Sequence, residues 1–240
     1  EMSADRHPQS PGEQKPHLIQ AVAGPREARW RALLDRIAAG MLLVLLAPVF
    51  LIVGIAVKLD CPRAGVFYRQ ERVGLNRRGG GASPVGQDRR SRRGSGKPFM
   101  IWKFRTMIPD AEAASGPVWA TLEDPRITRV GKILRQTRLD ELPQLINVLW
   151  GDMRLVGPRP ERPQFVESLS AGVPGYSDRL KVPPGITGLA QVERAYDENV
   201  EDVRTKLRYD LFYIQNRRPM MDLKILFKTL SVVFGRRGSR

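Results

Sequence analysis

The chain has few of the residues that disulfides and zinc sites require. It contains one cysteine, Cys61, among 240 residues, which excludes an intrachain disulfide and mildly favours a reducing compartment. Both histidines, His7 and His17, lie near the start, so we expect no structural zinc site. Acidic residues are also scarce, 25 against 40 Lys and Arg, and the formal charge is +15. This excess predicts an anionic partner: nucleic acid, acidic lipid or a phosphorylated substrate.

The N-terminal part divides into a polar stretch and a long apolar run. Residues 1–28 are rich in Pro, Gln, Gly and charge, which predicts a disordered tail. The polar stretch is too long for a signal peptide. The run from Ile37 to Val57 contains 21 residues without a charge, close to the length that crosses a bilayer core of ~30 Å. We therefore assign residues 29–60 to a membrane helix.

Pro48 lies in the middle of this run, where it removes a backbone hydrogen bond and kinks the helix. Basic residues flank the run on both sides, and short basic flanks prefer the cytoplasmic face of a membrane. A re-entrant hairpin, which enters and leaves by the same face, satisfies both flanks, whereas a kinked span misplaces one. The residues alone leave the two alternatives open.

The sequence pattern of residues 61–235 predicts a mostly helical α+β domain, and residues 236–240 are expected to form a tail. Two short strands are expected, at 65–73 and 99–106, with Lys103 and Arg105 on one face of the second. Between them, residues 77–97 form a Gly-, Ser- and Arg-rich stretch, which predicts a flexible basic loop that is either solvated or in contact with anionic lipid. The segment from Met221 to Phe234 is amphipathic and suits either the membrane interface or packing on the domain.

The densest candidate for chemistry is the pair Asp140 and Glu141, just before an apolar helical stripe. Thr137 or Asp140 could cap that helix, and Pro143 is tolerated in its first turn. Acidic residues at a helix start usually only stabilise the helix, by roughly 0.3–1 kcal/mol. The alternative is a phosphate site, in which a carboxylate binds Mg²⁺ or attacks phosphorus. The spacing alone favours the first interpretation.

Basic residues around the acidic pair give weight to the second interpretation. Arginine binds phosphate through a rigid fork of donors, and the Gly-Pro-Arg-Pro turn would hold one such fork in place. Each residue alone is expected to be a solvated surface charge, but together they suit a diphosphate with a divalent ion. The candidates are Lys103, Arg105, Arg135, Arg138 and Arg159.

Several strings occur together in one order: KFRTM, then TRLDELPQLINVLWGDM, RLVGPRPERP, PPGITGLAQV and DLKILF. With the apolar run broken by Pro48, they resemble the bacterial sugar transferase family, the small monotopic phosphoglycosyl transferases, over residues 30–234 or so. The resemblance implies a re-entrant membrane helix in the bacterial inner membrane, with both ends and the catalytic domain in the cytoplasm.

The resemblance also implies a Mg²⁺-dependent reaction in two steps. Asp140 would attack the β-phosphate of a UDP-sugar and release UMP, and polyprenyl (undecaprenyl) phosphate would then take the sugar phosphate from the enzyme. Glu141 would position or deprotonate groups around Asp140, and Asp140 would also bind the metal. By matching position, Lys103, Arg135 and Arg159 would bind phosphates. The product would begin the synthesis of a polysaccharide or glycoconjugate.

The sequence departs from the family pattern near the expected donor site. Pro183 stands where relatives often have arginine, and Arg194 could replace that arginine. The sugar is therefore left open, as is a homodimer. The competing hypotheses are a membrane-tethered nucleic-acid-binding protein and a membrane scaffold. We expect no nucleic acid partner, because the basic residues do not alternate with exposed aromatic ones.

Overall fold

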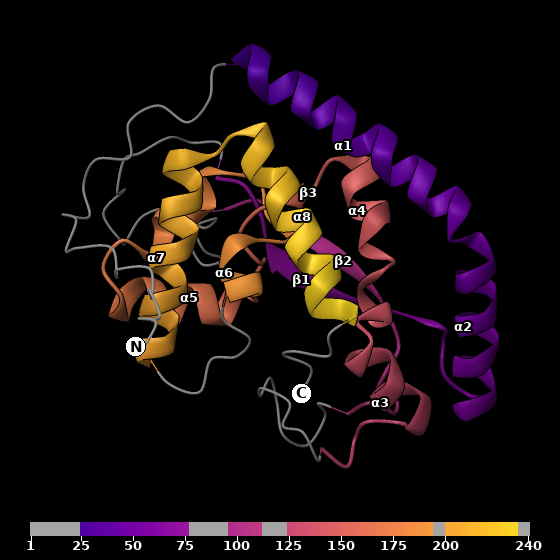
Figure 1. Ribbon diagram of the computed structural model, residues 1–240. Coiled ribbons are helices and arrows are strands. Elements are labelled where there is room, and N and C mark those ends of the chain that lie inside the picture. The colour runs from indigo at the N-terminus through magenta and orange to yellow at the C-terminus, as the bar shows by residue number, and fades with distance from the viewer. Residues whose placement is uncertain (1–24, 77–95, 112–123, 194–199, 235–240) are drawn as a thin grey trace, which may run out of the picture.

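The computed structural model describes residues 25–76, 96–111, 124–193 and 200–234, and over these it is mostly helical with little sheet. Helices α1 (Pro25–Leu45) and α2 (Ala47–Asp60) form a bent pair along one side of the molecule, which Figure 1 shows in indigo and violet. The bend measures 62° and falls at Leu46, just before Pro48 in the first turn of α2, as the proline predicts. No single helix in the described residues is long and apolar enough to cross a membrane, but this pair passes that test when taken together.

The first helix begins four residues before the boundary that the sequence predicts for the N-terminal tail. Helix α1 begins at Pro25 and not at residue 29. Proline favours the first position of a helix, and the sequence that follows it, Arg-Glu-Ala-Arg, has strong helix formers. The rest of the tail, the loop at residues 77–95 and the tail at 236–240 lie outside the described residues.

The two predicted strands form an antiparallel hairpin, β1 (Phe67–Val73) and β2 (Pro98–Phe104). Phe99 and Ile101 point from β2 onto α4 and are buried with Leu145. Because side chains alternate along a strand, Lys103 continues the same face beyond Ile101. The hairpin therefore directs a lysine toward the residues that precede α4.

The polypeptide then passes through short helices to a second, unpredicted sheet. The hairpin is followed by α3 (Arg129–Gln136), a 3₁₀ turn η2 (Leu139–Glu141) and α4 (Gln144–Trp150). Strands β3 (Arg154–Val156) and β4 (Gly185–Thr187) pair in parallel. A Cβ atom at Gly157 or Gly185 would overlap the backbone of the opposite segment. This close approach explains the two glycine-proline turns of the sequence.

The remaining elements of the described residues are helical. They are α5 (Pro163–Gly172), the 3₁₀ helix η3 (Tyr176–Lys181), α6 (Leu189–Glu193), α7 (Val200–Asn216) and α8 (Pro219–Phe234). In Figure 1, α8 lies in front of the sheet, α7 lies to its left beside α6, and α4 lies between the hairpin and α1. Helix α8 packs on the domain through Ile225, which is buried in the core, whereas Phe227 is 64% exposed.

Candidate active site

The acidic pair lies in the tight turn between α3 and α4. Thr137 ends α3, since its hydroxyl donates to the carbonyl oxygens of Ile133 and Leu134, so it does not cap the next helix as expected. Arg138 follows in a left-handed conformation with φ 59°, which reverses the chain. Asp140 and Glu141 therefore occupy the η2 turn before α4, rather than the first turn of the helix itself.

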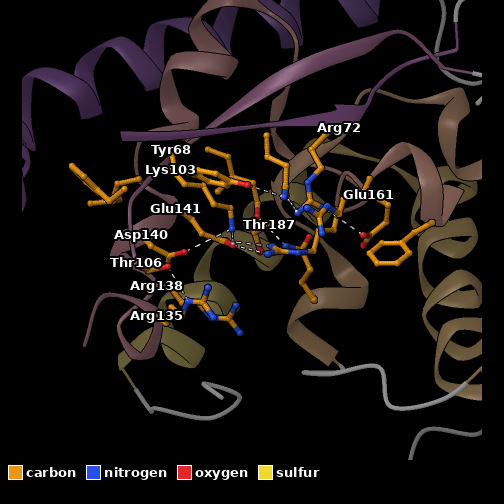
Figure 2. Close-up of a pocket in the computed structure, with 18 of the residues that line it drawn as sticks. Tyr68, Arg72, Lys103, Thr106, Arg135, Arg138, Asp140, Glu141, Glu161 and Thr187 are labelled. Carbon is orange, nitrogen blue, oxygen red and sulfur yellow. Dashed lines mark hydrogen bonds and ion pairs between the residues drawn. The ribbon is translucent and has the colours of Figure 1, made fainter. Parts of the chain in front are cut away.

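Glu141 is buried and bound by two cations. Its Oε1 lies 2.9 Å from Lys103 Nζ and 2.5 Å from Arg159 Nη2, and its Oε2 lies 3.3 Å from Arg159 Nη1. Figure 2 shows Lys103 from the hairpin pointing at this carboxylate. The forked contact with Arg159 uses both carboxylate oxygens, a geometry that lysine cannot provide. Glu141 thus joins the hairpin, the η2 turn and the Gly157–Pro160 turn.

Asp140 is equally buried, at 6% exposure, but has far less contact with cations. Its one ion-pair partner among the described residues is Lys103, whose Nζ lies 3.7 Å from Oδ2. The two neighbouring carboxylates therefore differ sharply: one is fully engaged, and the other keeps oxygen atoms available for a ligand.

The pKa values of the two carboxyl groups move in opposite directions. Burial raises the pKa of Asp140, and the negative charge of Glu141 adds to this, while Lys103 opposes it. Burial also acts to raise the pKa of Glu141, but Arg159 and Lys103 overcome it and hold that pKa well below its ordinary value. Glu141 is therefore a fixed anion, whereas Asp140 is the more basic carboxylate of the pair.

The other predicted basic residues lie at different distances from the pair. Arg135 on α3 is held by a hydrogen bond from Nε to Thr106 Oγ1 at 3.0 Å, and its charge acts on Asp140. Arg138 lines the same cavity. Arg105 also lines it, but its Nε donates to the carbonyl oxygen of Gly65 and its guanidinium lies over the Tyr68 ring. Arg194 lies outside the described residues.

A cavity of about 1070 Å³ opens beside these residues. Its described lining has twice as many basic as acidic side chains, so it suits a polyanion. At one edge it reaches Leu42 and Leu46, at the break between α1 and α2. The basic residues of the lining are Arg72, Lys103, Arg105, Arg126, Arg135, Arg138, Arg159, Arg162, Arg179 and Lys206, and the acidic ones are Asp110, Asp140, Glu141, Glu161 and Asp210.

Residues 26–236 match the family model described as bacterial sugar transferase. The chain belongs to the bacterial sugar transferase family. Among characterised relatives, it is 42% identical over 208 residues to a UDP-glucose:undecaprenyl-phosphate glucose-1-phosphate transferase of Caulobacter vibrioides, covering 83% of this chain and 68% of that protein. It is 38% identical over 207 residues to a UDP-N-acetylgalactosamine-undecaprenyl-phosphate N-acetylgalactosaminephosphotransferase of Aeromonas hydrophila, covering 86% and 44%.

The share of each relative that the chain covers differs among the relatives. The chain spans less than half of the length of the Aeromonas hydrophila protein, but it aligns with 86% of an exopolysaccharide production protein of Rhizobium leguminosarum at 37% identity. The family resemblance read from the motifs is thus confirmed. The names of the Caulobacter vibrioides and Aeromonas hydrophila proteins share undecaprenyl phosphate and differ in the sugar.

Sequence reasoning missed one residue that fixes the site of this family member. Asn147 on α4 is fully buried, and its side chain pairs with the free edge of β2. Its Oδ1 accepts from the backbone N–H of Trp102 at 3.0 Å, and its Nδ2 donates to the carbonyl oxygen of Met100 at 2.8 Å. A buried amide on an apolar helix is the signal that could have revealed it, because such a group must find partners.

Proposed function

We propose that this enzyme transfers a sugar 1-phosphate from a UDP-sugar to polyprenyl phosphate, giving polyprenyl-diphosphate-sugar and UMP. The observation that carries the proposal is a basic cavity in which one buried carboxylate, Asp140, keeps oxygens available while its neighbour is fully paired. The related transferases whose names specify UDP-sugar donors and undecaprenyl phosphate support it.

In the first step, an Asp140 oxygen attacks the β-phosphorus of the donor. The bond from that phosphorus to the oxygen bridging the α-phosphate breaks, and UMP leaves with the bonding electrons. In the second step, a phosphate oxygen of the acceptor attacks the same phosphorus and displaces the Asp140 carboxylate. The raised pKa of Asp140 supports this role, because a more basic carboxylate is the better nucleophile.

The cations of the site have separate tasks in this mechanism. Arg159 and Lys103 neutralise Glu141, which leaves Asp140 in a field that favours an approaching diphosphate. Arg135, fixed by Thr106, lies on the Asp140 side, where it would stabilise the charge that develops on phosphate oxygens. Oriented donors of this kind lower the barrier without rearranging during the reaction.

Mg²⁺ is the cofactor that fits this site. No group of three or more His, Cys, Asp or Glu in the described part of the chain could hold a metal ion. Mg²⁺ commonly uses only one or two carboxylates together with substrate phosphates, so Asp140 and a bound diphosphate would suffice. When bound, it would offset the negative charge of the phosphates as the phosphorus is attacked.

The apolar surface of α1 and α2 supports attachment to the inner membrane as a re-entrant pair, with the catalytic domain in the cytoplasm. Several of its large side chains are more than 65% exposed, a concentration that a soluble surface rarely carries. The cavity reaches the bend of this pair at Leu42 and Leu46, so the acceptor would arrive from the lipid side. The exposed residues are Met41, Val44, Leu45, Leu51, Ile52 and Leu59.

The experiment is nucleotide release from a panel of UDP-sugars, in detergent with Mg²⁺ and undecaprenyl phosphate. We expect UMP from at least one donor, and no UMP from Asp140→Asn. Without acceptor, intact-mass measurement should show wild-type protein heavier by one sugar phosphate and no such gain in Asp140→Asn. Asp152→Asn is the matched control, because Asp152 pairs with Lys97 and does not line the cavity.

The nucleotide that leaves distinguishes the mechanisms. UDP instead of UMP would mean transfer of the sugar without its phosphate, and would rule out attack at the β-phosphorus. UMP release without a mass gain on the protein would favour direct transfer between donor and acceptor. Loss of activity in Asp152→Asn as well would show that the effect is not specific to Asp140.

A further inference from the structure

The turn that presents Arg159 to Glu141 is held by a buried arginine from another element. Arg179 on η3 donates from Nη2 to the backbone carbonyl oxygen of Arg159 at 3.0 Å. Its Nε donates to Asp210 Oδ2 at 3.0 Å, and its Nη1 donates to the Tyr176 hydroxyl at 2.7 Å. Arg179 and Asp210 are only 9% and 2% exposed. All three nitrogens of this guanidinium are therefore engaged within the protein.

The backbone hydrogen bonds that tie this turn to the second sheet lie before Arg159: Gly157 N–H donates to the Thr187 carbonyl oxygen, and Gly185 N–H donates to the Pro158 carbonyl oxygen. Arg159 lies between Pro158 and Pro160, which have no N–H groups to donate. Side chains instead hold the carbonyl oxygens of this segment. Arg179 donates to the Arg159 carbonyl oxygen, and Arg72 on β1 donates to the Pro160 carbonyl oxygen at 3.0 Å. A buried guanidinium from η3 and a partly buried one from β1 thus hold adjacent peptide units.

A purely stabilising role explains this arrangement poorly. A buried ion pair contributes little to stability compared with apolar residues of similar volume, because both ions lose their hydration. The Arg179–Asp210 pair joins η3 to α7, and the apolar residues around it, Val203 and Leu207, already pack these elements together. The pair also fixes the Arg179 guanidinium as a donor to the backbone carbonyl oxygen of Arg159, the residue whose side chain binds Glu141.

We propose that Arg179, oriented by Asp210, is a positioning residue: it fixes the Arg159 backbone so that the Arg159 fork meets Glu141. This inference rests on the proposed function, because its effect on rate is exerted through the same site. If the turn is loosened, Arg159 loses its two-point contact, the charge of Glu141 is less well neutralised, and Asp140 faces an incoming diphosphate in a less favourable field.

The test is a double-mutant cycle on UMP formation with Arg179→Lys, Arg159→Lys and the double variant. Lysine keeps the charge near Asp210 but cannot bond Asp210, Tyr176 and the carbonyl together. We expect Arg179→Lys to lower the rate about tenfold, and to lower it less than about twofold further when Arg159 is already lysine. A merely structural role would lower the rate by the same factor in both backgrounds.

A second readout does not depend on activity. The amides of Gly157 and Gly185 bond to Thr187 and Pro158 across the turn, and their hydrogen exchange reports its opening. We expect faster exchange at these amides in Arg179→Lys, with little change in Arg204→Lys, an exposed arginine of α7. If Arg179→Lys fails to fold, Asp210→Asn replaces it, since Asn Oδ1 can still accept from Arg179 Nε.

The outcomes separate the two proposals. Unchanged exchange in the turn, or equal rate losses in both backgrounds of an active enzyme, would overturn the positioning role. If wild type releases no UMP from any donor, the proposed function fails. The exchange measurement then decides by itself whether Arg179 fixes the Arg159 turn.

Discussion

Two clusters in this molecule contain the same kinds of residues. In each cluster, two acidic and two basic side chains that are at least partly buried lie close together. The dyad cluster consists of Lys103, Asp140, Glu141 and Arg159. The α1 cluster consists of Arg31, Asp35, Arg154 and Asp222.

Access and pairing distinguish the two clusters. In the α1 cluster each acid has its own arginine, Asp222 with Arg31 at 3.1 Å and Asp35 with Arg154 at 3.5 Å, and none of the four lines the cavity. The dyad cluster faces the cavity, and its cations concentrate on Glu141 rather than on Asp140. Charge composition alone therefore does not distinguish the two clusters, whereas a carboxylate with available oxygens on an open cavity is found only in the dyad cluster of the two.

The largest effect that would test this comparison is expected from Glu141→Gln. The substitution leaves Lys103 and Arg159 near a neutral group, and we expect a loss of about 2–3 kcal/mol in unfolding free energy, less than for a fully buried pair because Arg159 is one-third exposed. UMP formation should fall about 100-fold. Chemical denaturation and nucleotide release check the two parts, and a stable, active variant would contradict the assigned role.

The same variant gives a pH signature. The folded-state pKa of Glu141 is lowered, so its contribution to stability is complete above the unfolded pKa of about 4.3 and is lost as pH falls below it toward the folded pKa. The difference in unfolding free energy between wild type and Glu141→Gln should therefore be constant near neutral pH and shrink below about pH 4.3. A difference that grows in acid would mean that the folded-state pKa of Glu141 is raised rather than lowered.

The sequence predicted the residues of the dyad cluster better than the buried residues that hold this cluster in place. Its two acids and its two cations, Lys103 and Arg159, lie in or beside recognisable turns and strands, so local patterns and family motifs were enough to name them. Arg179 and Asp210 were not recognised, because 31 residues separate them and each alone resembles a solvated charge on a helix. Local patterns cannot show that two distant charges become buried against one another.

The second sheet was missed for a related reason. Strands β3 and β4 have three residues each, too short for a periodic signal, and their pairing depends on two glycines approaching closely across about thirty residues. The sequence also predicts an apolar packing face at Leu142, Leu145, Ile146 and Leu149, but Leu149 is 41% exposed while Asn147 is fully buried. Asn147 is buried although it is polar, because its amide forms hydrogen bonds with the backbone at the edge of β2.

A medium effect is expected from Asn147→Ala, which tests whether a neutral residue holds the dyad cluster in place. The substitution leaves the N–H of Trp102 and the carbonyl of Met100 without their partner, so we expect a loss of about 2 kcal/mol. Because α4 would shift against β2, UMP formation should also fall, by about tenfold. Asn216→Ala is the control, since Asn216 makes an exposed contact with Phe212 and should leave both measurements unchanged.

A smaller effect, on stability alone, is expected from Asp222→Ala in the α1 cluster. Asp222 accepts from Arg31 and from the Tyr213 hydroxyl, and the hydroxyl keeps a second acceptor, the Val156 carbonyl oxygen at 3.3 Å. Burial raises the pKa of Asp222, so its ionised form is already disfavoured and its removal should cost only about 1 kcal/mol. The rate of UMP formation should stay within about twofold of wild type. A large fall in rate would show that the two clusters are functionally coupled.

The smallest effect is expected at the Lys228–Glu193 pair, which joins α8 to α6 at 2.6 Å. Its N···O distance is only 0.1 Å longer than that of the Arg159–Glu141 contact. The side chains of Lys228 and Glu193 are nevertheless 48% and 32% exposed. Water screens such a pair, so Glu193→Gln should change the unfolding free energy by less than about 0.5 kcal/mol, and salt should reduce even that. Denaturation at low and high salt is the measurement. A loss as large as that of Glu141→Gln would mean that contact distance, rather than burial and access, sets the strength of charged pairs in this protein.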